Sequence, residues 1–332
     1  LAWEPWRTCL CTEDRNAGNP MSKESAGKSE KCTADCISKS GRREDVVMRT
    51  KAGGDSPMIR GGAGFTPENI LDVLDGNLAR LGTDYIDLYQ LHWPVRGSYM
   101  FRQNWTFDPR GQDRAQTMDH IAGVLEKLKQ AQDAGKIRAF GLSNESAWGT
   151  TKWIDVAEEL GAPRVVSVQN EYSLLCRLYD TDMAEISVNE DVVCFSFSPL
   201  AAGLLTGKYQ NGAVPDGSRM TFGPQLGGRV QPRVFDAVEA YFKVAEKHDM
   251  SLAHMAMAFQ RSRPFKVSAI FGASTSTQLA ELLEGKDLEP VPYTHLTLPT
   301  CHRAYDQVGA VTINKTQPSR INSVRRTRLI VS

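Results

Sequence analysis

The residues in this sequence that are best suited to chemistry are polar side chains that directly follow short apolar runs. Lys51 follows the first run and His92 follows the second, and both side chains can hold or transfer a proton. The later runs are followed by Ser143 and Asn144, by Gln169 and Asn170, by Ser198, and by Gly272, Ala273 and Ser274. A single lysine or histidine in such a place is usually structural. Six polar positions in order predict one site built from the carboxyl ends of six strands.

The apolar runs alternate with segments of helical periodicity, which predicts a βα repeat. We expect strands that begin at Val46, Tyr85, Ile137, Val165, Val192 and Val267. Helices are expected at 67–81, 121–135, 148–160, 180–188, 234–247, 251–260 and 275–283. Helices of this length suit right-handed crossovers between parallel strands, so the predicted fold class is α/β. A closed (β/α)8 barrel needs two strands more than these six.

Composition limits the kinds of partner. The 332 residues include 39 basic and 39 acidic side chains, so no overall charge attracts the chain to nucleic acid or to an anionic membrane. No apolar run approaches the roughly 20 residues that span a bilayer, and the first residues lack the pattern of a secretory signal. We therefore expect a soluble, cytoplasmic protein with a small-molecule ligand and with no nucleic-acid or membrane partner.

The two ends of the chain differ in composition from the middle. Residues 1–44 are mostly polar and are expected to form a disordered leader. Its four cysteines lack the close pairs and the histidines of a zinc site, so no metal is predicted. Residues 285–332 lose the periodicity of helices and strands and are expected to form a disordered basic tail. The predicted folded part is therefore residues 45–284.

The segment 81–94, with the sequence LGTDYIDLYQLHWP, resembles the fourth-strand signature of the aldo-keto reductases. Further segments similar to this family are GKIR at 135–138, GLSN at 141–144, QNEY at 169–172, FSPL at 197–200 and GAS at 272–274. The resemblance covers about residues 45–284 and is strongest to the branch related to potassium-channel β subunits. It implies a (β/α)8 barrel of which the first two βα units are absent here.

The resemblance also implies an activity, which is hydride transfer between a nicotinamide and a substrate carbonyl, with a tyrosine exchanging the proton. Lys51 matches the lysine that lowers the pKa of this tyrosine, and His92 matches the histidine that orients the carbonyl. The family places its tyrosine and an aspartate upstream of the lysine strand, but no tyrosine occurs before Tyr85. We therefore expect an NADPH-dependent reductase of aldehydes or ketones that is severely impaired. The alternatives are a non-catalytic NADP(H)-binding or regulatory protein and a truncated, non-functional reading frame.

The cofactor implied by the resemblance is NADP(H). Ser143, Asn144 and Gln169 match contacts to the nicotinamide carboxamide, and Phe197 matches the aromatic residue that stacks on the nicotinamide ring. The matches to the pyrophosphate loop are Ser198, Leu200, Gly203 and Lys208, and Lys208 together with Arg219 places positive charge near a 2′-phosphate. The matches on the adenosine side are Gly272, Ser274, Gln278 and Glu281. The sequence has no G-x-G-x-x-G motif, which argues against a Rossmann dehydrogenase.

Overall fold

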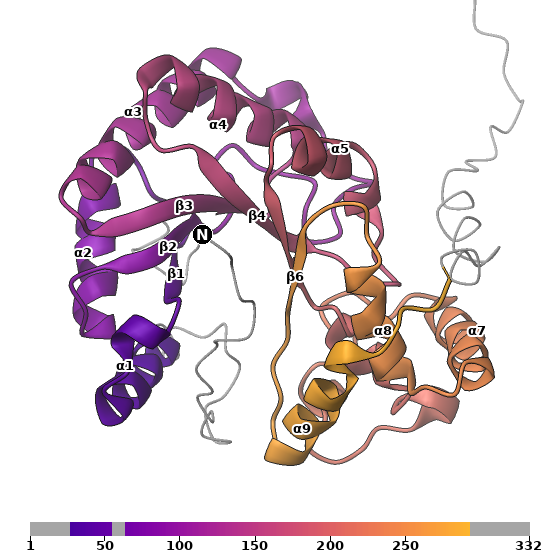
Figure 1. Ribbon diagram of the computed structural model, residues 1–332. Coiled ribbons are helices and arrows are strands. Elements are labelled where there is room, and N and C mark those ends of the chain that lie inside the picture. Colours follow the sequence, from indigo (N-terminus) through magenta and orange to yellow (C-terminus); the bar gives the residue numbers. More distant parts are fainter. Residues whose placement is uncertain (1–26, 55–63, 293–332) are drawn as a thin grey trace, which may run out of the picture.

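A computed structural model describes residues 27–54 and 64–292, which form one curved sheet with helices along its convex side (Figure 1). The six strands are parallel and follow the order β1-β2-β3-β4-β5-β6. They are β1 Arg49–Ala52, β2 Ile86–Leu91, β3 Ile137–Ser143, β4 Val165–Glu171, β5 Val193–Phe197 and β6 Val267–Ile270. The predicted α/β fold with six parallel strands is confirmed. Within the described residues β1 and β6 are not paired, so the sheet is an open arc of a barrel.

Helices connect the strands in the predicted order. They are α2 Ile70–Leu81, α3 Arg114–Asp133, α4 Ala147–Leu160, α5 Asp182–Asn189, α6 Arg219–Phe222, α7 Val234–Lys247, α8 Leu252–Arg261 and α9 Ser276–Glu284. Helices α2 to α5 cover the convex side, whereas α7, α8 and α9 gather near β6 (Figure 1). Side chains that accept hydrogen bonds from the first turn fix several helix starts, as Ser146 does for α4 and Thr275 does for α9.

The first strand begins at Arg49 and not at Val46 as predicted. Its extent is set by main-chain pairing with β2, and the paired residues include Lys51 and Gln90. The apolar residues before it serve packing instead, since Met48 is buried and its main-chain amide donates to the carboxylate of Asp87. Lys51 therefore lies within the strand and not after it.

The predicted disordered leader is wrong for Lys28–Ser40, which form helix α1. Glu30 on this helix accepts hydrogen bonds from Thr50 Oγ1 at 2.5 Å and from Asn77 Nδ2 at 2.6 Å. These two contacts attach α1 to β1 and to α2. Composition favoured disorder because Ile37 is the one large aliphatic side chain of the helix. The ordering comes from the tertiary contacts of a charged residue, which composition does not reveal.

The predicted disordered tail is also wrong in its first part. Gly285–Asp287 form a 3₁₀ turn, η8, and Val291 is buried against the core. Arg261 of α8 donates to the main-chain oxygen of Leu288, which brings this segment back to the fold. Residues 1–26 and 293–332, and with them Cys9 and Cys11, lie outside the described residues. Within the described part, no helix is both long enough and apolar enough to cross a membrane.

The two faces of the sheet carry different side chains. Tyr89 of β2 donates to Asn77 of α2 at 3.1 Å, and the Phe140 ring of β3 contacts Trp153 of α4 at a centroid separation of 6.2 Å. Tyr89 and Phe140 are paired in register and therefore both face the helices. Neighbouring residues of a strand point to opposite faces. The next register row, which faces the concave side, is Lys51, Gln90 and Gly141.

Candidate cofactor and carbonyl site

Two cations from β1 lie on the concave face. Arg49 and Lys51 are two residues apart on one strand, so both side chains point to this face. The guanidinium of Arg49 lies 5.1 Å from the ring centroid of Phe195 on β5, which places it across the arc of the sheet. Burial, and secondly the charge of Arg49, lower the pKa of Lys51 to about 8. Lys51 can therefore exchange a proton near neutral pH.

His92 follows β2 at the same end of the sheet. Burial, and secondly the charge of Lys51, lower the pKa of His92 to about 3, so its imidazole is neutral at physiological pH. Its ring packs against Trp93 with 4.4 Å between ring centroids, and its main-chain oxygen accepts from Asn144 Nδ2 at 2.9 Å. A neutral imidazole can donate a hydrogen bond to a carbonyl oxygen. It is too weak an acid to protonate one.

Ser143, Asn144 and Gln169 lie together at the ends of β3 and β4. The hydroxyl of Ser143 donates to the main-chain oxygen of Gln169 at 3.0 Å and accepts from Asn144 Nδ2 at 3.1 Å. The hydroxyl of Ser143 and the side-chain amide of Asn144 are therefore both engaged in hydrogen bonds within the protein. Gln169 Oε1, in contrast, is buried without a hydrogen-bond partner among the described residues. A buried acceptor of this kind fits the amide group of a nicotinamide carboxamide.

Phe197 is the last residue of β5, and Ser198 directly follows it. Phe197 is half-buried, which leaves part of its ring accessible for stacking. Ser198 adopts a left-handed conformation with φ of 54°, and its hydroxyl accepts from Arg229 Nη2 at 3.2 Å. Arg229 also pairs with Glu171 at the end of β4, with 2.8 Å between Nε and Oε1. Sequence reasoning missed Arg229, which no local pattern connects with β4 or β5.

The residues assigned to the pyrophosphate loop follow β5. Gly203 has φ of 98°, and a side-chain carbon there would lie 2.8 Å from Cε of Lys208. Glycine therefore permits Lys208 to fold back over the loop. Leu200 packs against a small apolar cluster of α8 and α9 that includes Met257 and Leu282. Arg219 is exposed at the start of α6, where its charge faces solvent.

The residues assigned to the adenosine side follow β6. Gly272, Ser274, Gln278 and Glu281 are all exposed. Gln278 Oε1 accepts from the main-chain amide of Ser274 at 2.9 Å, so the two residues form one turn at the start of α9. The main-chain oxygen of Glu281 is hydrogen-bonded to His254 Nε2 at 2.6 Å. The predicted site residues thus lie in the last residues of the strands or in the loops and turns that follow them, from β1 to β6.

Comparison with known proteins decides the family. Residues 25–291 match the aldo/keto reductase family. The chain belongs to the aldo/keto reductase family. It is 36% identical over 293 residues to the protein tas of Escherichia coli, with 86% of this chain and 83% of the relative covered. It is 34% identical over 251 residues to an aldo-keto reductase of Babesia bovis, with 71% and 87% covered. A probable voltage-gated potassium channel subunit beta of Arabidopsis thaliana is 27% identical over 272 residues, with 80% and 76% covered.

The family match begins at residue 25, so it includes α1. The predicted boundary at residue 45 is therefore wrong. The aldo/keto reductase region thus extends on both sides of the predicted range, since the match also includes residues 285–291.

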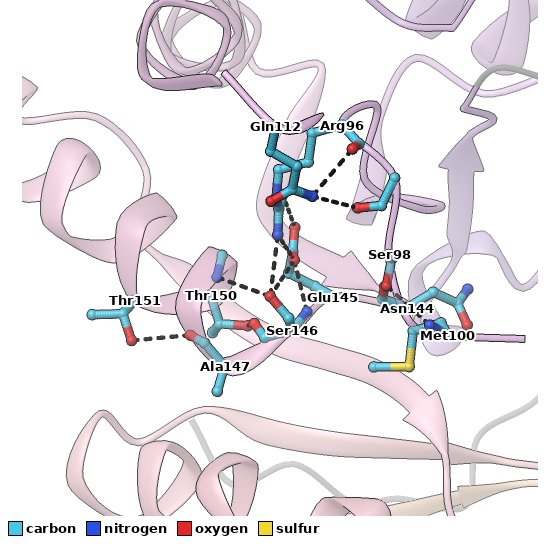
Figure 2. Close-up of polar contacts among 12 residues, drawn as sticks. Arg96, Ser98, Met100, Gln112, Asn144, Glu145, Ser146, Ala147, Thr150 and Thr151 are labelled. Atoms are coloured by element: carbon cyan, nitrogen blue, oxygen red, sulfur yellow. Dashed lines mark hydrogen bonds and ion pairs between the residues drawn. The ribbon is translucent and has the colours of Figure 1, made fainter. Parts of the chain in front are cut away.

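A network that sequence reasoning missed joins two loops of this aldo/keto reductase site, as Figure 2 shows. Arg96, on the loop after His92, forms an ion pair with Glu145, which directly follows Asn144. Nη1 and Nη2 of Arg96 both donate to the carboxylate, and the distance from Nη1 to Oε2 is 3.0 Å. The side chains are 11% and 3% exposed. No local pattern in the sequence connects Arg96 with Glu145.

Proposed function

We propose that this chain binds NADP(H) along the carboxyl ends of β3 to β6 and reduces a small aldehyde or ketone beside Lys51 and His92. The observation that carries the proposal is the placement of a buried lysine of lowered pKa and a neutral histidine at the ends of neighbouring strands. Membership in the aldo/keto reductase family supports carbonyl reduction in general. The unpartnered Gln169 Oε1 and the half-buried Phe197 support a nicotinamide next to that pair.

The proposed roles of the side chains follow from their protonation. When bound, the nicotinamide supplies the hydride. The neutral imidazole of His92 donates a hydrogen bond to the carbonyl oxygen and orients the substrate. Lys51 gives a proton from its ammonium group to that oxygen, which becomes the hydroxyl of the alcohol, and then takes another proton from water. A pKa of about 8 makes Lys51 a usable acid at neutral pH.

We expect turnover to be slow. The tyrosines that follow the site strands are poor proton donors at neutral pH. Burial raises the pKa of Tyr99, and burial followed by the charge of Asp180 raises the pKa of Tyr172. A well-matched general acid contributes roughly 10² to 10⁴ in rate, and Lys51 recovers part of that contribution.

The test is a titration of the purified chain with NADPH, followed by turnover of a nitrobenzaldehyde measured as the loss of NADPH absorbance. We expect binding of NADPH together with slow turnover. Lys51→Met should abolish turnover and retain binding, because Lys51 supplies the proton. Lys266→Met is the matched control, since Lys266 is exposed and pairs with Asp191 on the surface. A folded chain that binds neither NADPH nor NADH contradicts the proposal.

The preference for NADP(H) over NAD(H) rests on Lys208 and Arg219. Both carry positive charge near the loop assigned to the pyrophosphate, and the exposed guanidinium of Arg219 is free to approach a phosphate. Arg219→Ala should weaken NADPH binding by about tenfold and leave NADH binding unchanged. Equal weakening of both cofactors would place Arg219 elsewhere than at the 2′-phosphate.

A second candidate function is NADP(H) binding without catalysis, as in a regulatory protein. The raised pKa values of Tyr99 and Tyr172 favour it, because neither hydroxyl is a ready proton donor, whereas the assigned cofactor contacts do not depend on one. Similarity to a plant protein named as a probable potassium channel subunit beta is consistent with this candidate. The same titration separates the two functions. Binding of NADPH with no turnover in the wild-type chain supports the second.

A further inference from the structure

Two loops of the site are joined at several points, all at the carboxyl ends of β2 and β3 (Figure 2). One is the loop that follows His92 and the other is the turn that contains Asn144. Asn144 Nδ2 donates to the main-chain oxygen of His92 at 2.9 Å, and Ser98 Oγ donates to the main-chain oxygen of Asn144 at 3.3 Å. Arg96 then contacts the carboxylate of Glu145 and, at 3.1 Å, the hydroxyl of Ser146. The loops are bound through main chain and side chain alike.

The ion pair at the centre of these contacts is almost fully removed from water. A buried pair is stable only when its remaining hydrogen-bonding atoms are also satisfied. Here Glu145 Oε1 accepts from the main-chain amide of Ser146 at 2.7 Å in addition to the contact with Arg96. Gly149 lies beneath the pair, where a side-chain carbon would overlap both charged groups. The bidentate contact with Arg96 fixes the direction of the carboxylate as well as its distance.

The residue next to this pair has a left-handed main chain. Asn144 has φ of 52°, a conformation that asparagine adopts more readily than most residues other than glycine. Hydrogen bonds fix this conformation, since the main-chain amide of Asn144 donates to the main-chain oxygen of Gln169 at 2.9 Å and its own oxygen accepts from Ser98. Glu145, the next residue, is held through its main chain by Asn170, which accepts from its amide at 3.2 Å and donates to its oxygen at 2.9 Å, and through its side chain by Arg96. Of these two partners only Arg96 lies on the loop of His92, so loss of the ion pair would loosen that loop from the turn that contains Asn144.

We infer that Arg96 and Glu145 are positioning residues, which tie the loop of His92 to the turn that contains Asn144 and thereby fix that loop relative to the assigned carboxamide contacts. The consequence for catalysis rests on the proposed function. The link between the two loops does not, because all of its contacts are between protein atoms.

The test replaces Glu145 by glutamine. Glu145→Gln keeps the shape of the side chain but removes its charge and presents an amide to the donors of Arg96. With labelled protein and no cofactor, we expect the side-chain amide signals of Asn144 and the ring signals of His92 to shift in the NMR spectrum. We also expect the Kd for NADPH to rise by about tenfold, as for the loss of one well-formed hydrogen bond.

The matched control is Arg110→Gln, which removes an exposed ion pair with Asp108 farther along the same loop region. It should leave the signals of Asn144 and His92 and the Kd unchanged. Arg96→Lys keeps the charge but not the bidentate contact, and it should give shifts intermediate between wild type and Glu145→Gln. If the pair served stability alone, these variants would unfold more easily. Their folded fraction would still show the wild-type NMR signals of Asn144 and His92 and the wild-type Kd for NADPH.

The inference is overturned if Glu145→Gln folds and leaves both sets of NMR signals at their wild-type positions. If this variant does not fold, Ser98→Ala tests the same link without disturbing a charge, and unchanged Asn144 signals in it overturn the inference. If the wild-type chain binds no NADPH, the proposed function fails, whereas the cofactor-free NMR comparison still decides whether Arg96 and Glu145 hold the two loops together.

Discussion

The rim formed by the loops after β2 and β3 differs from the concave face of the sheet in how its polar groups are paired. On the rim, the charges of Arg96 and Glu145 are paired with each other and their remaining atoms are hydrogen-bonded. On the concave face, both amide atoms of Gln90 and the hydroxyl of Ser167 have no hydrogen-bond partner among the described residues. Among the residues that the structure describes, no carboxylate forms an ion pair with Lys51 or Arg49 either.

The rim and the concave face therefore have different functions within one site. Groups that satisfy one another hold geometry, and their removal should cost stability. Buried polar groups that lack protein partners lower the stability of the fold. A ligand can supply the partners that these groups lack. Substitutions on the rim and on the concave face should therefore change the free energy of unfolding in opposite directions.

The largest effect is expected from Arg96→Met. This substitution leaves the carboxylate of Glu145 buried without its partner, which typically costs about 3–5 kcal/mol. The free energy of unfolding, measured with urea, should fall by that amount. Arg110→Met, at the exposed pair with Asp108, should leave the urea midpoint unchanged. If the two variants behave alike, the pair with Glu145 has access to water and the rim is not the rigid region proposed here.

On the concave face, Lys51→Met should stabilise the chain. The pKa of Lys51 in the folded chain is about 8, below its ordinary value of 10.5. Below pH 8 the lysine is charged in the folded and the unfolded chain, so the full cost of burying the charge is present. Between pH 8 and 10.5 the unfolded chain binds more protons, so the stability of the wild type rises with pH. The advantage of Lys51→Met should thus be roughly 3 kcal/mol below pH 8 and should vanish near pH 10.5.

Thermal or urea unfolding across that pH range measures this advantage. Lys266→Met again serves as the control, because an exposed lysine should give no pH-dependent gain. A loss of stability in Lys51→Met at pH 7 would mean that an anion already pairs with Lys51, and the contrast between the two regions would then be smaller.

The pH dependence of turnover should show the same pKa. If the ammonium form of Lys51 supplies the proton, kcat should be constant below pH 8 and should fall by about tenfold for each further pH unit. His92 contributes no step above pH 5, since its pKa is about 3. A rate that rises through pH 8 would instead assign Lys51 the role of a base. The initial rate at saturating NADPH and aldehyde, measured from pH 6 to 10, decides between these outcomes.

The sequence predicted the order of elements well because that order depends on local periodicity. Helix α7 has the predicted bounds, since an apolar residue recurs once in each turn from Val234 onward. Lys51, His92 and Gln169 were assigned to one end of the sheet because parallel strands align their carboxyl ends. This part of the site follows from topology alone.

The missed features all depend on contacts between distant residues. Arg96 and Glu145 are separated by 49 positions, and nothing in either segment specifies the other. Helix α1 is held through Glu30, whose partners on β1 and α2 are 20 and 47 positions away. Such polar tertiary contacts have no periodic signature. A single glutamate in a polar segment is therefore expected from the sequence to face solvent. In the fold, Glu30 instead attaches its helix to a strand and to a second helix.

The smallest effect is expected from Gln90→Leu, which tests the concave face without touching a charge. Gln90 is fully buried, and both polar atoms of its side chain lack partners among the described residues. A buried group of this kind costs roughly 1–3 kcal/mol, and leucine of similar volume removes that cost. We expect a gain of about 1 kcal/mol in the free energy of unfolding, since repacking of leucine offsets part of the benefit.

Gln112→Leu on the rim is the matched comparison and should lose stability, because Gln112 Nε2 donates to the main-chain oxygen of Arg96 at 3.2 Å. A loss in both variants would show that water or another group already satisfies Gln90, and the concave face would then resemble the rim in its pairing.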